Sequence, residues 1–203
     1  MEDKAFWALM DELSSRPGDR QERLEWLRGR LRCRPAAEGL EFQARLDAAC
    51  AAVATGALWR AVGRIEGGLC SDDGFDYFAL WLVAQGQGTY EAVLADPDAL
   101  ADIAEVRALV GRHPRGWRDD EWPEWEELDY VAPEILGELT GQEIDCGETF
   151  YEIPDAAQET CIKPERRSDI REATVRAETP RIDALFPVRT GSCSVTRRRR
   201  PRP

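Results

Sequence analysis

Apolar side chains recur every three or four residues along most of the first 140 positions, which is the spacing of one face of an α-helix. The opening run is typical, with Phe6, Met10 and Leu13 behind two acidic residues that suit the positive end of a helix. No alternation of apolar and polar residues is long enough to predict a sheet. The pattern therefore predicts an all-α fold, a single irregular multi-helix domain, with helices near residues 6–13, 19–34, 36–55, 58–65, 72–85, 90–95, 97–109 and 123–139.

Glycine, proline and capping residues mark the predicted helix ends. Gly67 and Gly68 follow the fourth helix, where glycine can adopt the left-handed conformation that closes a helix. Ser71 or Asp72 is expected to cap the next helix, which is apolar on nearly all sides and is predicted to be the central buried one. Pro133 predicts a kink or a break inside the last helix.

The apolar periodicity fades beyond about residue 147, and six of the twelve prolines follow it. A segment of that composition is typical of flexible chain. We therefore expect a helical domain over residues 1–147 and a disordered tail over residues 148–203, with an arginine-rich end from Arg197 to Arg202.

Charge divides the chain into two unequal parts. Residues 163–203 carry 12 basic and 5 acidic side chains, a net charge of +7, which leaves −19 for residues 1–162 out of the total of −12. Because lysine and arginine drive affinity for phosphate backbones, the folded body is not expected to bind nucleic acid. A basic protein fits the charge better, and mimicry of nucleic acid toward a DNA-binding protein is a third hypothesis.

The arginine-rich end has several interpretations. It could bind nucleic acid or another anionic surface, fold back on the acidic body, or be an extension without a role. The last two interpretations are favoured, because the negative charge of the body would oppose any polyanion that the tail recruits.

Nothing in the sequence indicates a membrane or a cofactor. No stretch reaches the roughly 20 apolar residues of a membrane span, and the N-terminus lacks a basic region followed by an apolar run. We therefore expect a cytoplasmic protein, with its six scattered cysteines as reduced thiols. The Gly86-Gln87-Gly88 segment follows a predicted helix rather than a strand, so a dinucleotide fingerprint is excluded and no cofactor is predicted.

A segment rich in acidic residues and tryptophan is one candidate binding site. Between Trp117 and Glu152 the chain carries 13 acidic residues and one arginine. One interpretation is a surface that docks a basic partner, with tryptophans as anchors and carboxylates that steer the encounter. The other is a solvated helix whose tryptophans face the core. The residues concerned are Trp117, Trp122, Trp125, Asp119, Asp120 and Glu121.

Three carboxylates within five residues, Asp72, Asp73 and Asp76, are the alternative candidate. They could hold Mg²⁺ or Ca²⁺, with Tyr77 or His113 assisting an enzymatic reaction. The spacing does not match an EF-hand loop, and carboxylates at a helix start also arise from capping alone. His113 is the chain's one histidine, so a histidine-rich zinc site is excluded.

The order of aromatic and acidic residues resembles a known family. Three stretches are similar to the bacterial domain-of-unknown-function 4240 family, and together they span roughly residues 4–141. They are the opening Phe6-Trp7-Ala8-Leu9-Met10-Asp11-Glu12, the sequence from Gly67 to Gly86 and on to Leu100, and the sequence from Tyr130 to Glu134. The resemblance implies a helical bacterial domain and carries no activity with it. Our leading hypothesis is a non-enzymatic module that works by protein–protein contact, and its rival is a metal-dependent enzyme or metal-binding domain.

Overall fold

The structure is a computed structural model that describes residues 1–140 and 178–188. Every regular element within these ranges is helical, which confirms the predicted all-α fold. The α-helices are α1 (Asp3–Ser15), α2 (Arg20–Arg32), α3 (Ala36–Val53), α4 (Gly56–Ile65), α5 (Asp72–Val83), α6 (Gln87–Ala95), α7 (Ala104–Ala108), α8 (Val131–Thr140) and α10 (Pro180–Leu185). Short 3₁₀ helices link them at η1 (Pro97–Asp102), η2 (Pro114–Gly116), η3 (Asp119–Glu121) and η4 (Glu126–Leu128).

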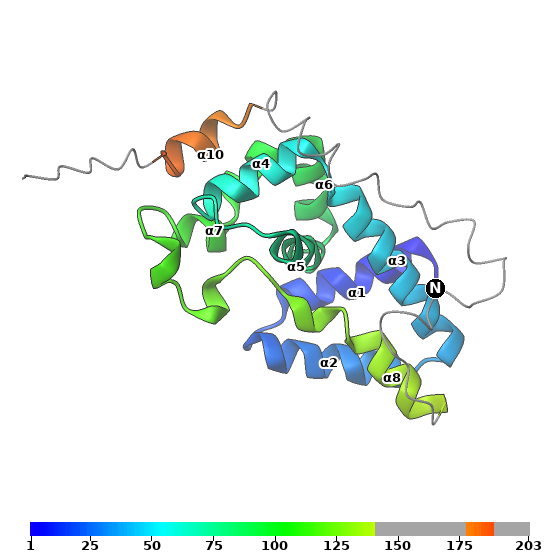
Figure 1. Cartoon of the computed structure of the whole chain (residues 1–203). Coiled ribbons are helices and arrows are strands. Elements are labelled where there is room, and N and C mark those ends of the chain that lie inside the picture. The colour runs from blue at the N-terminus through cyan, green and yellow to red at the C-terminus, as the bar shows by residue number, and fades with distance from the viewer. Residues whose placement is uncertain (141–177, 189–203) are drawn as a thin grey trace, which may run out of the picture.

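Helix α5 lies at the centre of the domain, as its nearly continuous apolar sequence predicts. Figure 1 shows it almost end-on, with other helices on several sides, and it packs against α3, α4, α6 and η4. Phe78, Leu82 and Val83 are fully buried. Each such side chain contributes roughly 1.5–3 kcal/mol through the hydrophobic effect, so α5 organises the core.

A second group of helices, α1, α2, α3 and α8, closes one side of this core. Helix α8 packs against both α2 and α3 and lies beside α2 in Figure 1. Phe6 of α1 meets Phe42 of α3 with ring centroids 5.4 Å apart, and Trp7 meets Tyr90 of α6 at 4.7 Å. These aromatic contacts join helices that are distant in sequence into one core.

Local signals set the helix ends much as predicted. Asp19 and Glu22 form a reciprocal capping box at the start of α2, with N–H to carboxylate distances of 2.9 and 3.0 Å. Ser71 caps α5 by accepting the N–H of Gly74 at 3.0 Å. Gly67 and Gly68 close α4 with φ angles of 62° and 83°, which confirms the predicted glycine stop.

Two of the predicted helices each consist of two shorter helices in the structure. The predicted helix over 97–109 consists of η1 followed by α7, and the one over 123–139 consists of η4 followed by α8. Of the kink or break expected at Pro133, the structure has a break: η4 ends at Leu128 and α8 begins at Val131, which places Pro133 in the first turn of α8. Proline removes no helical hydrogen bond there, since the first N–H groups have no partner within the helix.

The predicted tail contains a short helix that docks on the body. Helix α10 packs against α4 and η1, and Ile182 and Phe186 join the hydrophobic core. The expectation of flexible chain is therefore wrong for residues 178–188. The predicted domain boundary near residue 147 and the arginine-rich end lie outside the described residues.

The described cysteines and helices bear on two further expectations. Cys33, Cys50 and Cys70 are free thiols, and the other three cysteines lie outside the described ranges. Within those ranges, no helix combines the length and the apolar character that crossing a membrane requires.

The guanidinium of Arg20 is expected to hold α2 against the segment before η4. It donates to the carbonyl oxygens of Trp122 and Glu124 at 2.6 and 2.7 Å. Arg20→Met leaves both part-buried carbonyls without this donor, so we expect the free energy of unfolding in urea to fall by roughly 1–3 kcal/mol. The matched change Arg30→Met, at an exposed position of the same helix, should cost less than about 0.5 kcal/mol. Equal losses in the two variants would contradict the role of Arg20.

Candidate functional site

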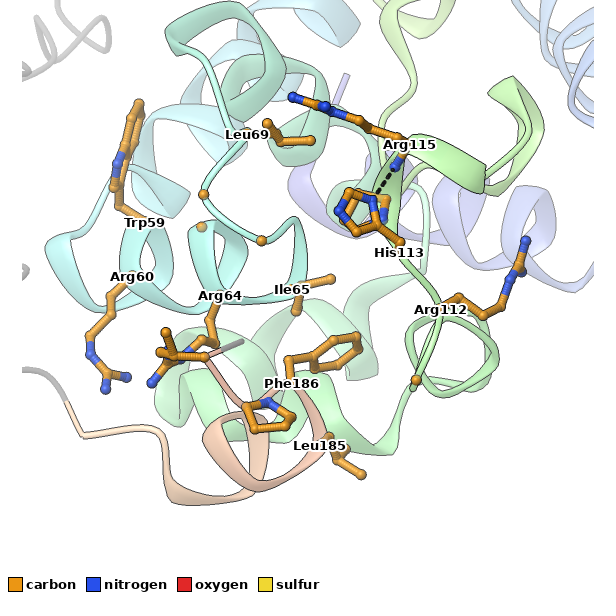
Figure 2. Close-up of a pocket in the computed structure, with 17 residues that line it drawn as sticks. Trp59, Arg60, Arg64, Ile65, Leu69, Arg112, His113, Arg115, Leu185 and Phe186 are labelled. Atoms are coloured by element: carbon orange, nitrogen blue, oxygen red, sulfur yellow. Dashed lines mark hydrogen bonds between the residues drawn. The ribbon is translucent and has the colours of Figure 1, made fainter. Parts of the chain in front are cut away.

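A pocket of about 970 Å³ lies between the end of α4, the turn at residues 111–115 and the C-terminal segment 185–188. Figure 2 shows side chains from all three segments around it. This volume is at the upper end of those of typical small-molecule sites. The apolar part of its wall includes Trp59, Ile65, Leu69, Pro114, Leu185 and Phe186.

The polar part of the pocket wall is basic. Four arginines and one histidine line it, and none of the lining residues carries a carboxylate. In a chain with a net charge of −12, this is a local reversal of sign. The basic lining residues are Arg60, Arg64, Arg112, His113 and Arg115.

The four arginines differ in how far their charge is neutralised. Arg112 pairs with Glu121 at 2.7 Å, and its side chain turns away from the other labelled residues in Figure 2. Arg60 and Arg64 share one carboxylate, that of Asp183, so this group keeps one net positive charge. Arg115 has no ion pair among the residues that the structure describes. The pocket therefore offers positive charge at both of its ends.

His113 is held by the turn that carries it. Its Nδ1 accepts the backbone N–H of Arg115 at 3.1 Å, which caps the short helix η2. In the neutral imidazole this leaves the proton on Nε2, so that nitrogen is a hydrogen-bond donor. The sequence singled out His113 as an assistant to a metal reaction, whereas the structure places it in the wall of a basic pocket.

A buried carboxylate follows directly after the α4 residues that line the pocket. Glu66 is fully buried, and neither of its carboxylate oxygens has a hydrogen-bond partner among the described residues. Burial, and secondarily the charge of Glu124, raise the pKa of Glu66 to about 8. Burial also raises the pKa of the neighbouring Cys70 thiol well above its usual range, so Cys70 is a poor nucleophile.

The acidic, tryptophan-bearing segment does not form the surface that the docking hypothesis describes. Trp117 and Trp125 are 7% and 1% exposed and belong to the core. Trp122 is half-buried and packs edge-on against Trp117 with ring centroids 4.9 Å apart. For Trp117 and Trp125 the expected role as anchors is therefore wrong, and the interpretation in which they face the core holds.

The carboxylates of that segment are partly used within the chain. Asp120 pairs with Arg118 at 2.9 Å, and Glu121 pairs with Arg112 at 2.7 Å. These arginines lower the pKa of both carboxyl groups, that of Glu121 to about 2. Asp119 is exposed. The surface left for a basic partner is smaller than the sequence suggests.

The three aspartates at the start of α5 do not form a metal centre. Asp72 lies half-buried in the first helical turn, while Asp73 and Asp76 are exposed. In residues 1–140 and 178–188, no three or more histidine, cysteine or acidic side chains are arranged to hold a metal ion. The metal hypothesis therefore gains no support from the geometry, and acidic residues in the first turn of a helix capped by Ser71 fit the capping interpretation.

Sequence reasoning missed most of the pocket. Arg60, Arg64 and Arg115 were not recognised because each lies in a different local context and only the fold brings them together. One signal was present, since Arg112-His113-Pro114-Arg115 is a compact basic turn within an otherwise acidic body. A local reversal of charge of this kind is a reason to look for an anion site.

Comparison with known proteins gives a family and no activity. The family model described as "Protein of unknown function (DUF4240)" matches residues 1–136. The chain belongs to this family. No curated protein and no solved structure matches it. The two pocket segments from α4 and the turn at 111–115 lie within the DUF4240 match, whereas the third wall, at residues 185–188, lies beyond it.

The buried Glu66 is expected to make the stability of this DUF4240 protein depend on pH. Its pKa rises from the ordinary value of 4.5 in the unfolded chain to about 8 in the fold. The stability that its protonated form contributes is therefore present below pH 4.5 and is lost as the pH rises to 8. Glu66→Gln should remove this loss, so that unfolding at pH 8 requires roughly 1–3 kcal/mol more than in the wild type.

Thermal unfolding at intervals between pH 5 and pH 9 checks this expectation. The difference in Tm between Glu66→Gln and the wild type should grow as the pH rises. A matched change at an exposed carboxylate, Glu12→Gln, should leave the pH profile unaltered. A constant difference for Glu66→Gln across the range would show that the buried carboxyl group does not titrate there.

Proposed function

We propose that this domain is a ligand-binding module, and that its site is the pocket between α4, the 111–115 turn and the C-terminal segment. The ligand is an anion with an apolar body. The observation that carries this proposal is the pocket wall itself, which combines basic and apolar side chains and contains no carboxylate, in a chain of net charge −12.

The separation of the pocket wall into apolar and basic parts supports an anionic ligand with an apolar body. Ile65, Leu185 and Phe186 offer apolar surface between the two basic ends of the pocket. A mostly apolar pocket with a few polar groups that fix orientation is the usual form of a small-molecule site. Guanidinium groups bind carboxylate and phosphate oxygens through paired hydrogen bonds, so either anion suits the basic ends.

The test compares three small molecules that share one apolar body and differ in charge. The probes are 3-phenylpropionate, its neutral amide and the cationic 3-phenylpropylamine, titrated while the backbone amide signals of the protein are followed by nuclear magnetic resonance. The acid should shift the signals of the pocket glycines, which are Gly63, Gly67, Gly68 and Gly111. The amide should bind at least about tenfold more weakly, because one charge-assisted hydrogen bond contributes roughly 1.5–3 kcal/mol.

Arg115→Ala is the variant that tests the unpaired end of the pocket. It should weaken binding of 3-phenylpropionate by about five- to tenfold, since it removes a guanidinium without an ion pair in the described chain. Arg107→Ala removes an exposed arginine outside the pocket and should leave the affinity unchanged. Equal binding of the acid, the amide and the amine would defeat the proposal of an anion site.

A basic protein partner is the second candidate function. It is supported by exposed Asp119 and Glu127 near the half-buried Trp122. Carboxylates at a rim steer a basic partner, and one partly exposed tryptophan can serve as a contact. Site residues Asp120 and Glu121 contribute less, because arginines of the same chain already pair with them.

Charge reversal tests this second candidate. The double change Asp119→Lys with Glu127→Lys should weaken binding of an arginine-rich peptide by about tenfold at low salt. The control is the double change Glu12→Lys with Glu105→Lys, which alters the net charge equally at exposed positions elsewhere. A similar loss in both would indicate attraction by net charge alone and would remove the segment as a docking site.

A further inference from the structure

The C-terminal segment 178–188 is attached to the body by specific contacts at both of its ends. Asp98 of η1, only 4% exposed, accepts the backbone N–H groups of Arg181 and Ile182, each at 2.8 Å. The first turn of α10 is therefore capped by a carboxylate that lies more than 80 residues earlier in the chain. Ile182 is fully buried and Phe186 is 8% exposed, so apolar contacts anchor the other side of the segment.

Asp183 connects this docked segment to two arginines of the basic pocket. Its two carboxylate oxygens accept separate hydrogen bonds, one from Arg60 and one from Arg64, both at 2.7 Å. The two arginines are four residues apart on α4, and Figure 2 shows both side chains directed to the C-terminal segment. These guanidinium groups lower the pKa of the Asp183 carboxyl group, Arg60 first, so the group stays ionised at neutral pH.

We propose that Asp183 is a built-in competitor of the ligand, and that an anion bound at Arg60 and Arg64 displaces the Asp183 carboxylate from these two guanidinium groups, while Leu185 and Phe186 stay in the pocket wall. This inference rests on the proposed function of the pocket. The carboxylate of Asp183 binds two guanidinium groups, and an anionic ligand would bind the same two groups in the same way. Asp183 therefore neutralises one of the two positive charges at this basic end of the pocket.

The position of the segment in the chain supports a displaceable element. It lies beyond residues 1–136, which match the family, so the body that carries α4 and the turn at 111–115 is distinct from it. Helix α10 has only six residues, and helices of that length are not stable in isolation. Its docking therefore depends on the contacts with Asp98, Asp102, Arg60 and Arg64 and on two apolar anchors.

A segment on the same chain competes with a free ligand through its effective concentration. The apparent affinity of the protein for the ligand is the affinity of the open site multiplied by the fraction of molecules in which Asp183 has left the two arginines. Weakening the Asp183 contact raises that fraction. Binding of an anion should in turn release the Asp183 carboxylate, since both groups bind the same pair of guanidinium groups.

The experiment titrates the full chain and two variants with 3-phenylpropionate. Asp183→Asn keeps the size of the side chain and removes its charge, so the affinity should rise by about fivefold or more. Asp102→Asn is the matched control, because Asp102 pairs with Arg181 of the same helix and does not line the pocket. It should leave the affinity within about twofold of the wild type.

A second measurement on the wild type does not depend on any variant. Saturation with 3-phenylpropionate should shift the signal of the Asp183 side-chain carboxyl carbon, which reports the loss of its two guanidinium partners, together with the amide signals of residues 180–185. Binding with no change at residues 180–185, or equal affinity of Asp183→Asn and wild type, would overturn the displacement and leave the anion pocket standing. No shift of any pocket glycine in wild type or variant would instead overturn the proposed function, and the displacement with it.

Discussion

The burial of α5 is the constraint on which the rest of the structure depends. From Phe75 to Val83 nearly every side chain of this helix is apolar, so only the narrow side that carries Asp76 can face water without cost. Helices α3, α4 and α6 and the 3₁₀ helix η4 are the elements that cover it. The place of α4 follows from this requirement, because one face of α4 packs on α5 and the remainder is left for a second contact.

The second contact of α4 is with the C-terminal segment, and the pocket lies at this contact. Leu58, Val62 and Ile65 of α4 are buried, whereas Arg60 and Arg64 project from the helix toward the C-terminal segment. The left-handed glycines at 67 and 68 then stop the helix and let the chain turn beside Pro114 of the basic turn. A helix needed for the core thus carries two guanidinium groups to a surface hollow as a consequence of its amphipathic sequence.

Sequence periodicity predicted the features that depend on local order. The central helix, the start of α2 near Asp19, the cap at Ser71 and the glycine stop after α4 are all encoded within a few residues. Helix α10 could not be found in this way, because its cap is Asp98 and its apolar anchors are only Ile182 and Phe186. The pocket was missed for the same reason, since residues 59–69, 111–115 and 185–188 are brought together only by tertiary packing.

The charge of the whole chain limits what the pocket can bind. A net charge of −12 repels any anion at a distance, whereas the arginines act over the few ångströms at which solvent and salt no longer screen them. A small hydrated anion gains little there, because it gives up its water and meets guanidinium groups that are already shared with Asp183. A ligand that also covers Ile65, Leu185 and Phe186 gains from burying apolar surface, which the charge of the body does not oppose. Repulsion by the net charge and the gain from burying apolar surface together favour an amphipathic acid over a simple inorganic anion.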